Sequence, residues 1–360
     1  MTRNQNHDDD NASSSSSRKR FKNFNHNGVA SWSDVNHDVL FLIMMKLGVV
    51  DFVAFSGVCK SWRSFAVSNK NTFMASKPPM KISIGPHVNK EDSYYLLEDL
   101  KERRFKTIIP HSSCRAYCGL TCGYLILFGW ETHDFWLVNP ITRDELHFPD
   151  YPLSVGAREE EMWAIRGILV FSQAITGWVF LVLHGTISFC IAGKKGWNHV
   201  SSTLPIADLH VFKGKIYTLH AHCSLGELIL DLKSEWKGKW TLLETKSFPK
   251  PDLYFLRLAS SNEKLFVIGW VSKQKMFMEL DFGEMKWVSA EKTIQEYAIF
   301  YSYFNYSAAF ILELWADSQT QQTGYHEYFL DDDKSRKCMV YFDWMWYFPH
   351  DCLNVNFLDE

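Results

Sequence analysis

The sequence predicts a small all-α unit of three short helices followed by a large all-β domain, favoured as a β-propeller of roughly six blades. Apolar residues recur at helical spacing near the N-terminus, and short strand-like runs repeat further along the chain. Aromatic residues make up 16% of the 360 residues, and strands accommodate large rings better than helices do. A chain of this length is expected to contain one small and one large domain.

Residues 1–28 are predicted to form a disordered tail. They are rich in Asn, Asp and Ser, and contain too little apolar surface to offset the entropy lost on ordering. The basic residues 18–22 are either a nuclear import signal or a solvated stretch. Because no secretory signal is recognisable, we expect a reducing compartment, cytoplasm and/or nucleus, and eight free cysteine thiols.

Residues 29–72 are predicted to form the three helices. Gly48 ends the first, Asp51 is placed to cap the second, and residues 58–65 begin the third. The apolar stripe of the first helix consists of Val35, Val39, Leu40, Ile43, Met44 and Leu47. A unit of this size has a marginal core, so we expect its surplus apolar side chains to pack against the following domain or a partner protein.

Residues 73–79 are predicted to be a linker, and residues 80–360 to form the β domain. Three apolar runs in it are each followed, 15 or 16 residues later, by a turn-forming residue: Tyr124 by Asn139, Ile216 by Asp231, and Leu265 by Asp281. Trp240 and Trp287 follow the last two turns, and the repeat length fits one four-stranded propeller blade. A large β-sandwich is the alternative fold.

Charge and hydropathy argue against nucleic acid and membranes as partners. The 38 basic residues nearly balance the 41 acidic ones, and the net charge is −3. Residues 167–193 carry no Asp, Glu, Lys or Arg and are long enough to span a bilayer. Their glycines, polar residues and Val/Ile/Phe content are more typical of buried strands joined by turns. We therefore expect partners that recognise local surfaces.

We find no phosphate-binding Gly loop, zinc-protease motif or nucleophile elbow, and predict neither an enzyme nor a cofactor. Cys114, Cys118 and Cys122 are spaced by four, without the C-x-x-C step of a metal site. Residues 220–223, His-Ala-His-Cys, favour ordinary histidines over zinc ligands. The run 331–333, Asp-Asp-Asp, lacks the Gly and closing Glu of a calcium loop. No metal is therefore expected.

Three segments of the helical unit carry a family resemblance. They read Val-Asn-His-Asp-Val-Leu at 35–40, Leu-Gly-Val-Val-Asp-Phe at 47–52 and Val-Cys-Lys-Ser-Trp-Arg at 58–63. They resemble the F-box, and the last segment is the most specific. Val35-Asn36 replaces the family's initial Leu-Pro, and Met44-Met45 replace more usual residues, but Asn36 can still cap the helix and Val35 can still fill an apolar pocket.

The resemblance implies that this unit docks on a Skp-like adaptor and, through it, on cullin and RING subunits. The residues expected to bind the adaptor are Val35, Val39, Leu40, Ile43, Leu47, Phe52, Val58, Cys59 and Trp62. Amphipathic helices commonly dock in this way, by placing an apolar face into a partner's groove.

The β domain resembles that of plant F-box proteins with a KIB-type β-propeller. The matching segments are 122–125, 137–143 and 211–217, whereas the final seventy residues match poorly and are expected to form a degenerate closing blade. The resemblance implies a substrate-recognition subunit of an SCF-type (Skp–cullin–F-box) ubiquitin ligase, with an unknown protein target on unidentified propeller residues. The alternatives are an F-box/propeller binding protein that acts outside a ligase, and a propeller sugar-binding protein or enzyme that uses exposed aromatic rings.

Overall fold

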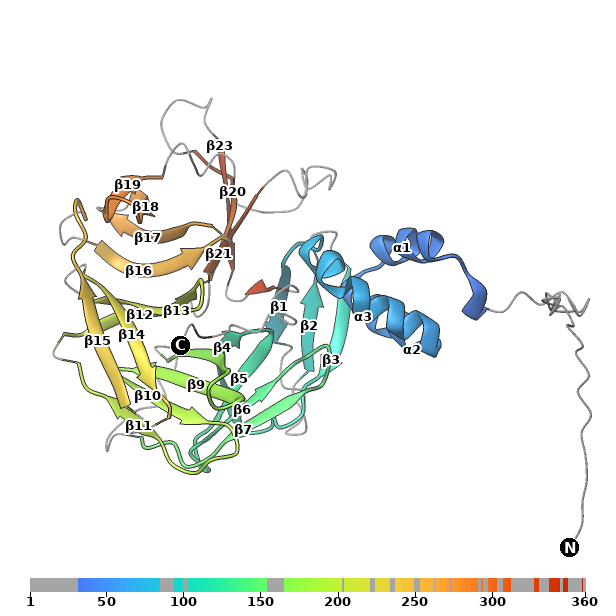
Figure 1. Cartoon of the computed structure of the whole chain (residues 1–360), viewed down its shortest axis with the longest axis horizontal. Coiled ribbons are helices and arrows are strands. Elements are labelled where there is room, and N and C mark those ends of the chain that lie inside the picture. The colour runs from blue at the N-terminus through green and yellow to red at the C-terminus, as the bar shows by residue number, and fades with distance from the viewer. Residues whose placement is uncertain are drawn as a thin grey trace, which may run out of the picture.

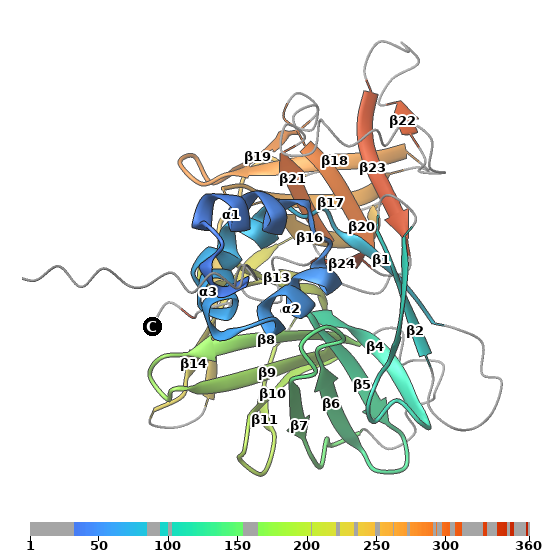
Figure 2. The ribbon, with the colours of Figure 1, turned by 90° about the vertical axis from the view of Figure 1, so that its right-hand side faces the viewer.

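The structure of the chain is a computed structural model. It describes residues 32–84, 94–99, 103–153, 165–202, 204–220, 224–233, 237–248, 253–261, 263–271, 274–290, 293, 297–302, 307–311, 327–329, 337–343, 346–348 and 358. Figure 1 shows three helices at the rim of a ring of β-sheets, next to β1, β2 and β3. Turned by 90°, the same helices lie in front of the sheets (Figure 2).

The helical part consists of η1 (Trp32–Asp34), α1 (His37–Lys46), α2 (Val49–Gly57) and α3 (Lys60–Ala75). Asn36 caps α1 as predicted, since its side-chain oxygen accepts a hydrogen bond of 2.7 Å from the Asp38 amide. Asp51 lies at the third position of α2, three residues after Gly48, which precedes the helix. From there its carboxylate accepts a hydrogen bond of 3.4 Å from the Gly48 amide, so it still caps this terminus.

The third helix, which residues 58–65 were predicted to begin, runs from Lys60 to Ala75. It contains a polar turn at residues 68–71, where Ser68 and Asn69 direct their side chains back to the carbonyls of Ser64 and Phe65, at 3.0 and 2.9 Å. The helix therefore continues through this polar turn to Phe73, which is fully buried. Polar residues on the solvent side of a helix do not end it when the buried side stays apolar.

The β domain is a propeller, which confirms the predicted fold. Four sheets of the described residues contain four strands each, in the orders β24-β1-β2-β3, β4-β5-β6-β7, β11-β10-β9-β8 and β12-β13-β14-β15. Their strands are β1 (Met80–Ile84), β2 (Tyr94–Glu98), β3 (Arg104–Ile108), β4 (Arg115–Thr121), β5 (Tyr124–Gly129), β6 (Asp134–Val138), β7 (Glu145–Phe148), β8 (Arg166–Ser172), β9 (Gly177–His184), β10 (Thr186–Ile191), β11 (Asn198–Val200), β12 (Ile206–Phe212), β13 (Lys215–His220), β14 (Leu225–Asp231), β15 (Lys237–Leu243) and β24 (Trp346–Tyr347). Successive strands within each sheet pair in antiparallel fashion.

The fifth sheet has eight strands, in the order β19-β18-β17-β16-β21-β20-β23-β22. They are β16 (Leu253–Ser260), β17 (Leu265–Val271), β18 (Gln274–Asp281), β19 (Lys286–Ser289), β20 (Tyr297–Ser302), β21 (Ser307–Ile311), β22 (Glu327–Phe329) and β23 (Lys337–Asp343). The first four form an antiparallel fifth blade. Strands β20 to β23 extend its sheet through the parallel pairs β16–β21 and β20–β23. The described residues thus form five blades, where the sequence predicts roughly six.

The first blade closes the ring with strands from both ends of the domain. Strand β24 pairs with β1, and the paired residues are Met80 with Tyr347 and Lys81 with Trp346. The ring is therefore closed by hydrogen bonds between segments that are far apart in sequence, and the closed ring leaves fewer free sheet edges.

The predicted repeat has a structural basis in the turns between third and fourth strands. Asn139, Asp231 and Asp281 each follow or end the third strand of a blade. Their side-chain oxygens accept hydrogen bonds from the backbone N–H two residues later, on Ile141, Lys233 and Gly283, at 2.9, 3.1 and 2.8 Å. Asn and Asp recur here because their short side chains hydrogen-bond the backbone of the turn that follows.

Tryptophans at the outer strands join neighbouring blades. The Trp197 indole, just before β11, donates a 2.8 Å hydrogen bond to the Pro149 carbonyl just after β7. Trp240 on β15 makes the equivalent bond of 2.8 Å to the Ser201 carbonyl just after β11. The aromatic content is thus used partly to connect consecutive blades, because an indole is apolar along its body and donates a hydrogen bond at its edge.

Residues 167–193, uncharged in sequence, lie mainly on strands β8, β9 and β10, and many of their side chains are buried. Among the described residues, no helix is both long enough and apolar enough to cross a membrane. The strands here are buried on both faces between neighbouring blades, which explains an apolar run without the usual alternation.

The helices and the first blade share one apolar core. Phe73 and Met74 of α3 belong to the same buried cluster as Met80, Ile82 and Tyr347 of the first blade. In the connection, the Lys77 ammonium donates a 2.8 Å hydrogen bond to the Met45 carbonyl and lies 4.4 Å from the centre of the Phe73 ring. The helical unit therefore packs against the following domain.

Candidate functional site

The helical part carries most of the large apolar side chains that are exposed among the described residues. Eleven large apolar side chains are exposed among the described residues, and seven of them lie on the helical part: Trp32, Val39, Leu42, Ile43, Val53, Val58 and Val67. Exposed apolar groups gathered on one small module typically mark a protein-binding surface. This surface is the candidate functional site.

The nine residues predicted to bind an adaptor differ in exposure. Val39, Ile43 and Val58 are exposed. Val35, Leu47 and Cys59 are half-buried and pack against the core shared with the propeller. Leu40, Phe52 and Trp62 are 1%, 6% and 7% exposed, so they hold the helices together and support the surface from beneath.

Helix α1 has two apolar sides. Leu40 and Met44, four residues apart, are buried against the core. Leu42 and Ile43 lie three and four residues after Val39 on the outward side, and Leu42 is 65% exposed. The sequence alone merged both sides into one stripe and left out Leu42, because apolar residues occupy every position from Val39 to Met45 and obscure the period.

The exposed residues are supported from beneath by packed aromatic side chains. The Trp62 indole donates a 2.8 Å hydrogen bond to the Trp32 carbonyl, and the two rings meet edge to face with centroids 6.1 Å apart. Phe52 stacks on Phe73 with centroids 4.2 Å apart. Trp62 of the Val-Cys-Lys-Ser-Trp-Arg segment is thus an internal anchor. Trp32, Val53 and Val67 had not been predicted as site residues, and their exposure on the folded helices is what identifies them.

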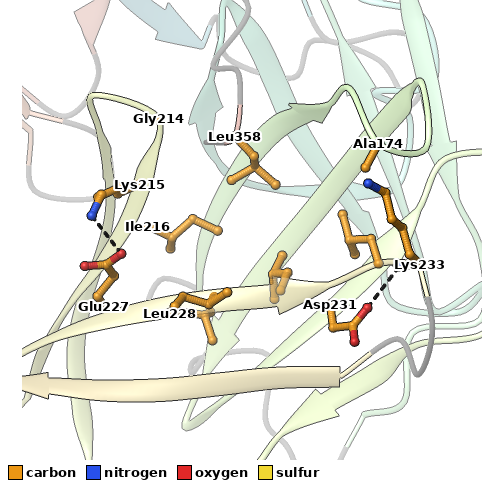
Figure 3. Close-up of a pocket in the computed structure, with 12 residues that line it drawn as sticks. Ala174, Gly214, Lys215, Ile216, Glu227, Leu228, Asp231, Lys233 and Leu358 are labelled. Carbon is orange, nitrogen blue, oxygen red and sulfur yellow. Dashed lines mark hydrogen bonds and ion pairs between the residues drawn. The ribbon is translucent and has the colours of Figure 1, made fainter. Parts of the chain in front are cut away.

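The propeller contains a cavity of about 560 Å³ between its third and fourth blades (Figure 3). It is lined by Ala174, Gly214, Lys215, Ile216, Glu227, Leu228, Ile229, Leu230, Asp231, Leu232, Lys233 and Leu358. Lys215 and Glu227 form an ion pair of 3.1 Å on one side of it, and Asp231 and Lys233 lie on the other. Its volume falls in the range of small-ligand and side-chain pockets.

A buried polar network connects the first strands of three blades. The Asp208 carboxylate on β12 accepts a 2.7 Å hydrogen bond from the Leu258 amide on β16 and lies 3.9 Å from the Arg166 guanidinium on β8. Burial raises the pKa of Asp208, and the charges of Arg257 and Arg166 oppose this. These contacts join the third, fourth and fifth blades, so the role of the network is structural.

A second polar cluster lies on the second blade. Asp134 accepts hydrogen bonds from Arg115, Thr132, His147 and the Trp136 indole, the last at 3.0 Å. Burial alone raises the pKa of Asp134, but the hydrogen bonds from Arg115, Thr132 and His147 and the charge of Arg115 lower it to about 2. Asp134 is therefore ionised at neutral pH and anchors the edge of this sheet.

The cysteines and histidines weighed as metal ligands have other surroundings. Cys118 is buried in the apolar core, and burial raises its pKa. The Cys122 thiol donates a 3.1 Å hydrogen bond to the Leu169 carbonyl, whereas Cys114 is exposed. Burial also lowers the pKa of His220, which lies 3.2 Å from the Thr218 hydroxyl. Residues 221–223 and 331–333 lie outside the described residues, within which no three metal-ligating side chains cluster.

Comparison of the sequence with known protein families divides the chain into the same two parts. Residues 32–74 match the F-box domain, and residues 93–341 match the KIB1-4 beta-propeller. A helical docking module fused to a propeller is therefore the class to which the fold belongs. The propeller match alone covers well over half of the chain, and the chain belongs to the F-box proteins with a KIB1-4 β-propeller, whose F-box points to an adaptor rather than a catalytic protein.

Similar proteins are known in Arabidopsis thaliana. "Putative F-box protein At4g22170" is 27% identical over 204 residues, which cover 52% of this chain and 55% of that protein. "F-box protein At3g56470" is 21% identical over 293 residues, covering 79% of this chain and 74% of that protein. The chain thus spans little more than half the length of the first of these relatives.

Two solved structures have a distant likeness. AztD from Citrobacter koseri has a TM-score of 0.31 and 12% identity, covering 54% of this chain and 51% of its own. The structure of YCF48 bound to D1 peptide has a TM-score of 0.30 and 9% identity, covering 59% of this chain and 84% of its own. Likenesses at this level carry no argument about function.

Proposed function

We propose that this chain is the substrate-recognition subunit of an SCF-type ubiquitin ligase. Its F-box binds a Skp-like adaptor, which links it to cullin and RING subunits, and its propeller holds a target protein. The chain's own contribution is proximity, because holding the target beside the ubiquitin-charged enzyme raises its effective concentration. Residence in the cytoplasm, the nucleus or both is part of this proposal.

The observation that carries the proposal is the exposed apolar side of the F-box. Val39, Leu42 and Ile43 form a stripe on α1 that nothing in the described residues covers. Fully burying one aliphatic side chain contributes roughly 1.5–3 kcal/mol of transfer free energy, so a few such residues support a stable complex. The buried base of Leu40, Phe52 and Trp62 supports the proposal by holding this stripe in place.

The first experiment is co-purification of the full chain with a plant Skp-like adaptor, followed by titration to obtain the dissociation constant. The variant Leu42→Asp/Ile43→Asp places charges on the exposed stripe and is expected to weaken binding by at least about a hundredfold. The matched control is Leu242→Asp, which alters an exposed leucine of the propeller and should bind as the wild type does. Retained binding by the double variant would contradict the proposal that this stripe binds the adaptor.

The runner-up is an F-box protein that binds the adaptor but acts outside a ligase. Co-purification of cullin and RING subunits through the adaptor separates the two, since only a ligase subunit would bring them down. No adaptor binding by the folded wild-type chain would mean that docking has lapsed, with Val35-Asn36 in place of Leu-Pro as the first suspect.

A sugar-binding propeller or a propeller enzyme would belong to a different class. Stacking platforms for sugars are exposed aromatic rings. Of the tryptophans whose side chains the structure describes, Trp32 on the F-box is exposed, whereas those on the propeller are buried or half-buried. This distribution favours target recognition by other groups, and we keep the adaptor function as the proposal.

A further inference from the structure

The cavity between the third and fourth blades already holds part of this chain. Leu358, half-buried, packs against the apolar cluster of these two blades and lines the cavity. Figure 3 shows its side chain pointing into the space above Ile216 and Leu228. The cavity of about 560 Å³ that remains beside it is larger than one side chain needs. The floor thus accepts an aliphatic group and has room for its neighbours.

Leu358 is held through its backbone as well. Its amide donates a hydrogen bond of 3.1 Å to the carbonyl of Phe171 on β8. Strand β8 pairs with β9 on one side only, and its first-strand neighbours β4 and β12 come from other blades. Hydrogen bonding at such an edge, with a side chain in an adjoining pocket, is the usual way in which a sheet binds an extended peptide.

The charged residues that line the cavity are two lysines, Lys215 and Lys233, and two carboxylates, Glu227 and Asp231. The Lys215 ammonium is paired with Glu227. Exposed Lys233 contacts Asp231 through its backbone amide, and its ammonium forms no ion pair in the part of the chain that the structure describes. In sequence, Asp359 and Glu360 directly follow Leu358. The aliphatic floor complements a leucine, and the Lys233 ammonium offers one cation to an acidic residue next to that leucine, although the lining as a whole carries no net charge.

We propose that this cavity and the adjoining edge of β8 form a binding site for an extended peptide in which a leucine is followed by acidic residues. Leu358 is its resident occupant. The inference rests on the proposed function, which it deepens: a target segment with the same chemistry must displace Leu358 to be held on the propeller. The intramolecular occupant then sets an affinity threshold for targets.

The test uses the full chain and a fluorescein-labelled peptide of residues 353–360, with binding followed by fluorescence anisotropy. In wild type the resident leucine competes with the peptide, whereas in Leu358→Ala it does not. The variant is therefore expected to bind the peptide at least about tenfold more tightly than wild type. A peptide that carries the Leu358→Ala change should lose at least about tenfold in affinity for the variant.

A matched pair of variants locates the binding. In the Leu358→Ala background, Ala174→Phe fills the cavity and should abolish peptide binding, whereas Gln173→Phe alters the same turn outside the lining and should not. Equal peptide affinity for wild type and Leu358→Ala, or equal affinity for the Ala174→Phe and Gln173→Phe chains, overturns the proposal. So does no binding by a Leu358→Ala chain that melts at the wild-type temperature.

A second measurement covers the case in which Leu358→Ala lowers stability. Excess isotopically labelled peptide is added to wild type, and hydrogen exchange is followed at the Leu358 amide. Displacement should speed this exchange, and an unchanged rate at saturating peptide contradicts the proposal. Neither experiment contains an adaptor, so failure here leaves the F-box docking result intact, and failure of docking leaves this site standing.

Discussion

The F-box and the propeller differ in how many of their large apolar side chains are exposed. Seven of the eleven that are exposed in the described residues lie between Trp32 and Val67, and four lie on the much longer propeller. Blades pack face to face around a closed ring, and this buries both sides of each sheet. Three helices against one blade can bury only one side each. The excess on the F-box therefore indicates where a second protein is needed, and the propeller shows no comparable excess.

The largest effect is expected where the two parts share a core. Phe73→Ala removes a fully buried ring that stacks on Phe52 and belongs to the cluster reaching the first blade. We expect a loss of about 4 kcal/mol in the free energy of unfolding, from lost burial and the cavity left behind. Chemical denaturation measures it. A loss confined to helical signal, with the propeller transition unchanged, would show that the two parts are less coupled than their common core implies.

Neighbouring residues on α1 provide a sharper comparison. Leu40→Ala truncates a side chain that is 1% exposed and should cost about 3 kcal/mol of stability. Val39→Ala truncates one that is 47% exposed and should change stability by less than about 0.5 kcal/mol. Thermal melting of both variants gives the comparison. Similar losses for the two would contradict the division of α1 into a core side and a docking side.

The same comparison of stability can be made for a charged residue of the propeller, Asp134. Asp134→Ala leaves the Arg115 guanidinium without its carboxylate and should cost about 2 kcal/mol at pH 7. Because the folded-state pKa of Asp134 is lowered to about 2, its contribution is complete above pH 4 or so and is lost as the pH falls toward 2. Unfolding experiments across this range should show the two chains converging in stability. A constant difference down to pH 2 would contradict the assignment.

The smallest effect concerns the start of the F-box. Asn36→Ala removes the hydrogen bond from the Asp38 amide and should cost about 1 kcal/mol. Asn36→Pro removes the same bond, but the φ of −56° at this position suits proline. It should therefore cost less than Asn36→Ala, and it restores the residue usual in the family. Comparing the adaptor affinities of the two variants tests whether Asn36 weakens docking.

Much of the fold could be predicted from residues with a local physical role. Asn36 and Asp51 indicate helix starts because their side chains cap backbone amides, and Asn139, Asp231 and Asp281 indicate one repeated turn for a similar reason. The end of α3 at Ala75 could not be predicted, because residues 68–71 are polar whether a helix continues or stops.

The candidate sites were less accessible to sequence reasoning. Leu40 and Leu42 have the same side chain two residues apart, yet one is buried and the other 65% exposed, and only the packing of α1 on α3 distinguishes them. Leu358 carries no local signal at all. Its role depends on a contact with Phe171, far away in the chain, and no spacing or motif encodes such a contact.

Closure of the propeller ring depends on a strand that is synthesised late. The ribosome makes the F-box and strand β1 early, but the strand that pairs with β1 only near residue 347. Tyr347 also completes the apolar cluster beneath the helices. A growing chain therefore emerges with its docking helices on an unfinished support, and a product that stops early keeps the F-box sequence without that support. Completion of the apolar support beneath the helices is in this way tied to having translated the whole propeller.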